Sequence, residues 1–282
     1  MNRLHRGVTP GRVLAYAVLI LIGIGGIAPF LYLAVLSTKR RIEIAAQVPP
    51  SLDFKWAQIV KNYREVLWDQ GMASFTLNSL FVVSVATFLA VLIGVPAAYA
   101  FSRLTFRGSE GLASFILSMR FMPPIAVAIP LFIMVKTAGL QDTYAGLILP
   151  YVAFSLPLIV WIMIGFFDEV PREIDEAAAI DGASHWRILM RVHLPVVWPG
   201  IMTSALFGAL FIWNEFLVAL YVVNSRSIQT ISLGAATLVS AQRPIDWNIA
   251  AAVGVVTVIP ILIFSLFVQR YIVRGLTAGA VK

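Results

Sequence analysis

Long apolar stretches, each long enough to cross a lipid bilayer, dominate this sequence. About 20 consecutive apolar residues span the hydrocarbon core as an α-helix. The stretches cover residues 13–36, 73–102, 110–137, 144–168, 197–222 and 248–271. Several contain prolines, which transmembrane helices tolerate where neighbouring helices satisfy the freed backbone groups. We therefore expect an all-α polytopic membrane protein, a packed bundle of about six transmembrane helices.

Composition agrees with this class. The 282 residues are 60% hydrophobic and 12% charged, whereas soluble domains carry about 25% charged residues. The net charge of +7 includes no basic run interleaved with aromatic residues, so the sequence indicates a lipid bilayer and no nucleic acid as partner. The chain has no cysteine, which excludes disulfides, thiolate metal sites and cysteine nucleophiles.

The first apolar stretch follows three arginines, as in a secretory signal peptide. It is too long for a signal core, and no small-residue cleavage site follows, so we interpret it as a transmembrane helix. The polar residues after it contain apolar side chains at helical spacing between Trp56 and Leu67. They predict an amphipathic helix at the outer membrane surface, with Trp56 and Trp68 at interfacial depth.

The long polar interruption of the C-terminal half lies at residues 168–196, between the fourth and fifth stretches. Residues 172–181 are mostly good helix formers, and Gly182 fits the left-handed position that ends a helix. Ser184 can cap a second short helix, which Pro195 is expected to end. The segment is predicted to form two helices around a glycine turn, with an alanine face that another surface can approach closely.

This segment resembles the cytoplasmic loop motif of ABC importer permeases. The motif consists of Glu-Ala-Ala, three residues, Gly, nine residues, an aliphatic residue, one residue and Leu-Pro. The matching positions are Glu176, Ala177, Ala178, Gly182, Val192, Leu194 and Pro195, with Val192 in place of the usual isoleucine. In that family the loop is a coupling helix that docks on a separate ATPase subunit. The alternative interpretation is an ordinary amphipathic loop helix.

Further short motifs are similar to the sugar-importer branch of that family, and most similar to the shorter of the two paralogous permeases in maltose-type importers. They are Asn62-Tyr63, Asn78-Ser79, residues 97–100, Arg103, residues 106–108, residues 213–216 and residues 274–282. The resemblance places the N-terminus and the Glu-Ala-Ala loop on the cytoplasmic side, and the slight excess of Lys and Arg in the inner segments agrees.

The resemblance implies a non-catalytic permease subunit of an ATP-driven importer in the bacterial cytoplasmic (inner) membrane. The expected substrate is a sugar, sugar derivative or polyol. The implied partners are a paralogous permease in a heterodimer, two ABC ATPase subunits and an extracytoplasmic solute-binding protein. ATP and Mg²⁺ would bind to the ATPases, because this chain contains no Gly-Lys dipeptide and hence no phosphate-binding loop.

Three segments follow from this interpretation. Residues 1–72 hold the first transmembrane helix and the outer amphipathic loop. Residues 73–272 form the permease core of five transmembrane helices, with the coupling loop at 168–196. Residues 273–282 form a cytoplasmic tail, which the resemblance brings to the ATPase pair.

Four residues are candidates for the substrate path. Arg120 and Glu215 are charged and lie inside predicted spans, where a charge is costly and usually faces a cavity or a partner. Trp213 and Asn214 precede Glu215, and the three offer a ring, an amide and a carboxylate to a hydroxyl-rich ligand. Helical geometry spreads the three over about 200°, so at most two can line one cavity.

Each charged candidate also has a structural alternative. Glu215 could be paired at the interface between the two permeases. Arg120 could be a structural partner of Glu215, or of carbonyl groups that the two following prolines release.

Two rival functions, a secondary transporter and an intramembrane enzyme, remain to be weighed from the residues, and so does another class of solute. A secondary transporter would also have midplane charges and broken helices, and an ABC permease could carry a non-carbohydrate solute. An intramembrane enzyme would need convergent acid–base or metal groups, which the spans do not offer. The three histidines, His5, His185 and His193, lack metal-ligand spacing and are predicted to be polar loop residues.

Overall fold

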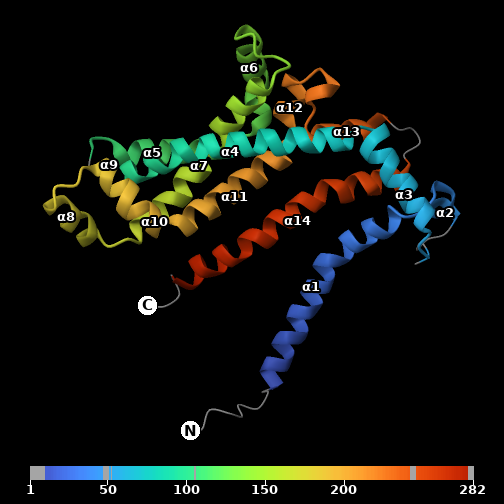
Figure 1. The fold of residues 1–282 in the computed structure, drawn as a ribbon, viewed down its shortest axis with the longest axis horizontal. Helices are drawn as coiled ribbons and strands as arrows, with labels where there is room; N and C mark the ends of the chain where they lie inside the picture. Colours follow the sequence, from blue (N-terminus) through green and yellow to red (C-terminus); the bar gives the residue numbers. More distant parts are fainter. Residues whose placement is uncertain (1–9, 47–50, 52, 105, 242–245, 279–282) are drawn as a thin grey trace. The chain divides into compact units, whose positions relative to one another are not determined.

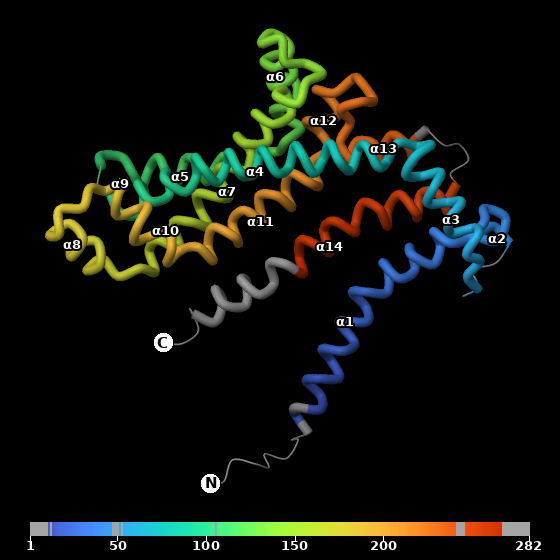
Figure 2. The backbone as a smooth tube through the Cα atoms, viewed as in Figure 1, coloured from blue at the N-terminus to red at the C-terminus, as the bar shows by residue number. Residues whose placement is uncertain are grey.

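The computed structural model describes residues 10–278 except 47–50, 52, 105 and 242–245. Within these residues every regular element is helical, as Figures 1 and 2 show. One compact unit comprises Met1–Gln70 with Leu238–Val256, and the other comprises Gly71–Thr237 with Thr257–Lys282. His5 and the last four residues of the predicted tail lie outside the described residues.

The first unit is built on a long apolar helix and a polar segment that folds against its end. Its N-terminal elements are α1 (Pro10–Leu36), α2 (Arg41–Ala46), α3 (Trp56–Arg64) and the π-helical turn η1 (Glu65–Asp69). The predicted first span and the predicted surface helix are therefore both present. Asn62 is buried, and its Nδ2 donates to the carbonyl oxygens of Ser37 at 2.8 Å and Lys39 at 3.0 Å. This side chain fastens α3 to the end of α1.

The second unit has a core of three helices that run alongside one another, α4 (Met72–Arg103), α7 (Tyr144–Asp168) and α11 (Trp198–Asn214). Ile159 of α7 is fully buried at their contact. A Cβ added to Gly94 of α4 would lie 2.9 Å from Ile159, and one added to Gly208 of α11 would lie 3.2 Å from it. Small residues thus let the three backbones approach closely, as is common between helices in membranes.

The second and fourth predicted spans are confirmed as single helices, α4 and α7, with Pro96, Pro150 and Pro157 inside them. The third span is broken. Its parts are α5 (Ser109–Ser118), the 3₁₀ turn η2 (Met119–Phe121) and α6 (Pro124–Thr137), and the two halves meet at 98°. The break lies at Pro123-Pro124, where the missing N–H groups cannot continue the helix.

The prediction of one continuous fifth helix over 197–222 is wrong. The helix α11 ends at Asn214, and a separate short helix, α12 (Leu217–Val222), follows an extended residue at Glu215. Another helix, α13, had no counterpart in the sequence prediction. The remaining elements of the chain are α8 (Arg172–Ile180), α9 (His185–Ile188), the π-helical turn η3 (Leu189–His193), α10 (Leu194–Val196), the 3₁₀ turn η4 (Arg226–Ile228), α13 (Ile231–Ala241) and α14 (Trp247–Ala278).

Four helices of the described chain are long and apolar enough to cross a membrane, namely α1, α4, α7 and the first part of α14. Two bent pairs bring the number to six if each pair counts as one span: α5 with α6, and the helical residues 185–196 with α11. The predicted class of an all-helical, multi-pass membrane protein is confirmed.

Candidate functional site

The polar segment between α7 and α11 forms a pair of short helices around a tight turn. In this turn Gly182 has φ +78°, as predicted, and its N–H donates to the carbonyl of Ala179 at 3.0 Å. Ser184 caps the second helix, since its Oγ accepts a hydrogen bond from the N–H of Arg187 at 3.4 Å. The helix–turn–helix prediction is therefore confirmed up to this point.

Most apolar side chains of α8 are exposed, as is Trp186 of α9, whereas Ile188 of α9 is buried. Helix α8 has no buried residue, and Ile180 at its end is 87% exposed. Trp186 of α9 is 62% exposed, and Met190 is 46% exposed. Among the motif residues, Glu176, Ala177, Gly182 and Pro195 are exposed, and Ala178, Val192 and Leu194 are half-buried. We call the exposed face of Glu176, Ala177, Ile180, Gly182, Trp186 and Met190 the docking surface, because exposed apolar groups rimmed by polar ones mark interaction sites.

Two predictions for this segment are wrong. Pro195 does not end the second helix; the chain stays helical through Val196 and turns by 81° before α11. The wider π-helical turn η3 precedes Pro195 and accommodates the residue that cannot donate an N–H. His193 is not a polar loop residue either, because it lies in η3 and is completely buried.

His193 belongs to a buried polar cluster at the base of the docking surface. Its Nε2 donates to Oδ1 of Asp175, which lies in the first turns of α8. Oδ2 of Asp175 lies 3.3 Å from Nε of Arg103, the last residue of α4. We call Arg103, Asp175 and His193 the anchor cluster. The motif comparison singled out Arg103 alone, and no sequence signal joined it to the other two.

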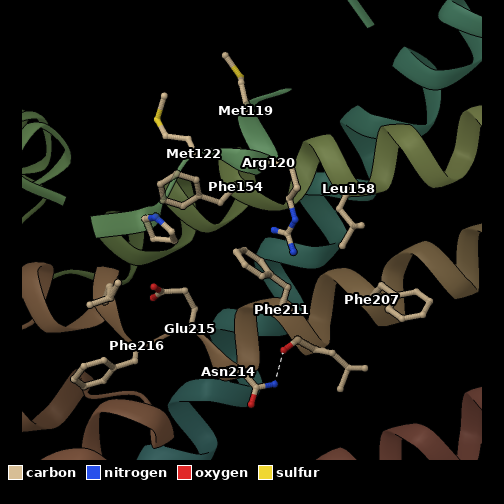
Figure 3. A pocket seen from close by; sticks show the side chains of 13 residues that line it. Met119, Arg120, Met122, Phe154, Leu158, Phe207, Phe211, Asn214, Glu215 and Phe216 are labelled. Carbon is tan, nitrogen blue, oxygen red and sulfur yellow. Dashed lines mark hydrogen bonds between the residues drawn. The ribbon is translucent and has the colours of Figure 1, made fainter. Parts of the chain in front are cut away.

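Three of the four candidates for the substrate path, Arg120, Asn214 and Glu215, line a cavity of about 780 Å³ in the second unit, shown in Figure 3. Four aromatic side chains and two methionines contribute most of its apolar lining. The lining residues are Met119, Arg120, Met122, Pro124, Phe154, Leu158, Phe207, Leu210, Phe211, Asn214, Glu215, Phe216 and Leu217. Cavities with mostly apolar walls and few polar groups are typical small-ligand sites.

Arg120 enters this cavity from the break in the third span. Its guanidinium lies over the ring of Phe211, with Cζ 4.2 Å from the ring centroid, as Figure 3 shows. A cation over an aromatic face is held by the ring quadrupole. The ion pairs of the described residues do not join Arg120 to Glu215. The alternative in which Arg120 is the ionic partner of Glu215 is therefore wrong.

Because the chain breaks between α11 and α12, the three adjacent candidates differ in whether they face the cavity. Asn214 and Glu215 line the cavity, and Nδ2 of Asn214 donates to the carbonyl of Leu210 at 2.7 Å. Both carboxylate oxygens of Glu215 accept from the N–H of Val218 at 3.1 Å, so Glu215 caps α12. At most two of the three were expected to face one cavity, and the structure places two there.

Trp213 is the candidate that lies outside the cavity. Its side chain is buried, and Nε1 donates to the carbonyl of Thr257 in α14 at 3.3 Å. Its ring meets that of Phe264 edge-on, with centroids 6.3 Å apart. Trp213 therefore packs α11 against the second half of α14. Among the described residues no group of three His, Asp or Glu side chains is placed to hold a metal ion.

The sequence comparison decides the family. Residues 90–278 match the family described as "Binding-protein-dependent transport system inner membrane component". The chain belongs to this family. It is thus a multi-pass, inner-membrane permease subunit of a binding-protein-dependent ABC importer, and the members of this family are non-catalytic. A transporter of this kind works with a solute-binding protein and an ATPase.

Two relatives and one solved structure cover nearly the whole permease. The "Trehalose/maltose transport system permease protein MalG" of Thermococcus litoralis is 34% identical over 273 residues, which cover 96% of this chain and 97% of the relative. The "Diacetylchitobiose uptake system permease protein NgcG" of Streptomyces coelicolor is 34% identical over 270 residues, 95% of this chain and 88% of the relative. The fold is similar, with a TM-score of 0.76 and 20% identity, to a chain in the crystal structure of a bacterial ABC transporter involved in the import of the acidic polysaccharide alginate; the match covers 96% of this chain and 99% of that chain.

Proposed function

We propose that this permease imports a sugar, sugar derivative or polyol through the cavity between α5–α6 and α11–α12. The observation that carries the proposal is the lining of that cavity. Phe154, Phe211 and Phe216 offer flat apolar faces to the C–H faces of a sugar ring, while Asn214 and Glu215 can bond its hydroxyl groups. The relatives named for trehalose, maltose and diacetylchitobiose transport support the same class of substrate.

The cavity is incomplete in this chain alone. Met119 and Met122 line it but remain 50% and 53% exposed, and Phe207 remains 43% exposed. In our proposal a paralogous permease supplies the facing wall, so that substrate passes between the two subunits of a heterodimer. Two ABC ATPase subunits holding ATP and Mg²⁺ drive the movement, and an extracytoplasmic solute-binding protein delivers the substrate.

The docking surface is the proposed contact with an ATPase subunit. It carries the Glu-Ala-Ala motif residues, exposes Ile180 and Trp186, and extends from the bundle on two short helices. Short helices transmit a displacement that a flexible loop would absorb. Movement of the ATPases would therefore reach α7 and α11, which flank the segment.

Glu215→Gln in the reconstituted complex tests the substrate path. Glutamine keeps the shape of the side chain and one acceptor oxygen for the α12 cap, but removes the charge. If the carboxylate bonds a sugar hydroxyl, the loss of a charged hydrogen bond, about 1.5–3 kcal/mol, should weaken apparent substrate affinity about 10- to 100-fold. The measurement is uptake of labelled maltose, trehalose and a polyol into proteoliposomes, with the yield of intact complex determined alongside.

The matched control is Glu110→Gln, an exposed acid of α5 outside the cavity. Weakened uptake with a full yield of complex supports the path, whereas a loss of the heterodimer in detergent makes Glu215 an interface residue. Unchanged uptake and assembly contradict both roles. Uptake of a non-carbohydrate solute, with none of any sugar or polyol, would contradict the proposed substrate class.

A further inference from the structure

The anchor cluster joins three segments that are far apart in the sequence. Arg103 ends α4, Asp175 lies in α8, and His193 ends η3. The side chain of His193 is fully buried, that of Arg103 is 5% exposed, and that of Asp175 is 20% exposed. One carboxylate thus forms an ion pair with the guanidinium through one oxygen and a hydrogen bond with the imidazole through the other.

Arg103 also reaches a fourth segment. Its Nη2 donates to the carbonyl oxygens of Phe167 and Val170, where α7 ends and the coupling loop begins. The planar guanidinium has five donors in a fixed fork, so one side chain can fix two carbonyls and a carboxylate together. Beside it, Oγ of Ser102 donates to the carboxylate of Asp168, again between α4 and the end of α7.

Two aromatic rings pack against the imidazole of His193. The ring of Tyr99 lies 5.2 Å from it and the ring of Phe167 lies 5.6 Å from it, each edge-on. The two aromatic rings also meet each other at 5.6 Å. The imidazole and the guanidinium are therefore shielded from water, while the carboxylate of Asp175 is 20% exposed. Shielding strengthens the electrostatic interactions of the buried groups.

Helix α8 is held to the bundle mainly through this cluster. It has no buried residue, and a nine-residue helix is marginal by itself in water. Among the described residues, Asp175 makes the only side-chain hydrogen bonds and ion pairs of α8. A force applied to α8 therefore reaches the bundle largely through Asp175 or through the backbone at the two ends of the helix.

We propose that Arg103, Asp175 and His193 are positioning residues that transmit motion from α8 to α4, α7 and η3. This inference rests on the proposed function, in which the docking surface contacts an ATPase. The anchor cluster then sets how much of the ATPase displacement reaches the bundle. Weakening it leaves the docking surface able to bind the ATPase, but lets α8 move without the helices behind it.

The test uses the complete transporter, with both permeases, the ATPases and the binding protein, in proteoliposomes. Asp175→Asn removes the charge that holds Arg103 and keeps the side-chain shape. ATPase co-purification and ATP hydrolysis should persist, while substrate transported per ATP hydrolysed falls about 2- to 30-fold, the range found for mutations in coupling networks. Glu169→Gln, an exposed acid just after α7, is the matched control and should leave the ratio unchanged.

A second pair of variants keeps the test valid if Asp175→Asn fails to assemble. Arg103→Gln removes the charge and the fork, whereas Arg103→Lys keeps the charge and should partly restore the transport-to-hydrolysis ratio. A ratio equal to that of the unmodified protein in both Asp175→Asn and Arg103→Gln would overturn the inference. So would a fall in transport that only parallels lost assembly or a lower melting temperature, because that result would reveal a purely structural role.

A separate variant distinguishes failure of this inference from failure of the proposed function. Ile180→Asp places a charge on the docking surface, away from the anchor cluster. Loss of ATPase co-purification in this variant supports the proposed docking surface, whatever the cluster variants do. Full co-purification would contradict the proposed docking surface, and the anchor cluster would then have no ATPase motion to transmit.

Discussion

Replacing Gly182 by valine should disrupt the docking surface by distorting the backbone turn between α8 and α9. Gly182 has φ +78°, a conformation that β-branched residues strongly disfavour. A Cβ built at this position meets no other atom within 4 Å. The Cβ of valine therefore meets no steric obstacle beyond its chain neighbours, and the main effect should come from the left-handed turn between α8 and α9.

The size of the effect follows from two contributions. Holding an L-residue in the left-handed region costs about 1–2 kcal/mol, and more for a β-branched side chain. If the turn instead changes conformation, it loses the hydrogen bonds from Gly182 N–H to Ala179 and from Ala183 N–H to Ala178, both 3.0 Å. Each is worth about 1 kcal/mol. Either route disfavours the docking conformation by at least about tenfold, since 1.4 kcal/mol is a factor of ten.

The assay compares Gly182→Val with Gly182→Asn, because asparagine tolerates the left-handed region. The tagged permease pair is purified from membranes, and the co-purified ATPase and the uptake of substrate are measured. The valine variant should insert normally but lose ATPase association and uptake, while the asparagine variant should stay close to the unmodified protein. Normal uptake by the valine variant would refute the reasoning, and equal losses in both variants would show that φ is not the cause.

Two further predictions concern stability. Gly94→Ala should destabilise the detergent-solubilised complex by about 1–3 kcal/mol, since the new Cβ would lie 2.9 Å from Ile159. The control Gly165→Ala meets no atom within 4 Å and should be neutral or stabilising. Thermal unfolding compares the two variants, and an equal response would contradict the packing argument. Hydrogen bonds from Oγ and N–H of Ser225, and then from the N–H of Asn224, lower the pKa of Asp142 below its usual 3.8. The folded pKa is depressed, so this stabilisation is complete above pH 3.8 and is lost as the pH falls through the lower folded pKa. The melting temperature of Asp142→Asn should therefore depend less on acid pH than that of the unmodified protein. An unchanged acid profile would contradict this prediction.

Long apolar runs with local end signals were predictable from the sequence. Helices α4 and α7 begin and end within about a residue of the predicted spans, because polar and turn residues bound each run. The bends within the third and fifth predicted spans were harder to predict. Apolar periodicity does not distinguish a straight span from two helices at 98°, and the end of α11 depends on the capping of α12 by Glu215.

The candidate sites divide in the same way. The roles of Gly182 and Ser184 were predictable, because turn and capping chemistry depends on neighbours in the chain. The partners of Arg103 and His193 were not, because Asp175 reaches them only once α4, α8 and η3 have packed together. The position of Trp213 depends likewise on α14, which lies far along the chain.

The π-helical turn η3 relates the length of the motif to the rotation of the helices that follow it. A π-helical turn holds one residue more than an α-helical turn, and one residue corresponds to about 100° of rotation. The nine residues between Gly182 and Val192 run into this turn. A related chain that lacked one residue here could close this turn to an α-helical turn and keep the rotational phase of α11 relative to α9. The motif can therefore lose one residue at η3 without rotating α11.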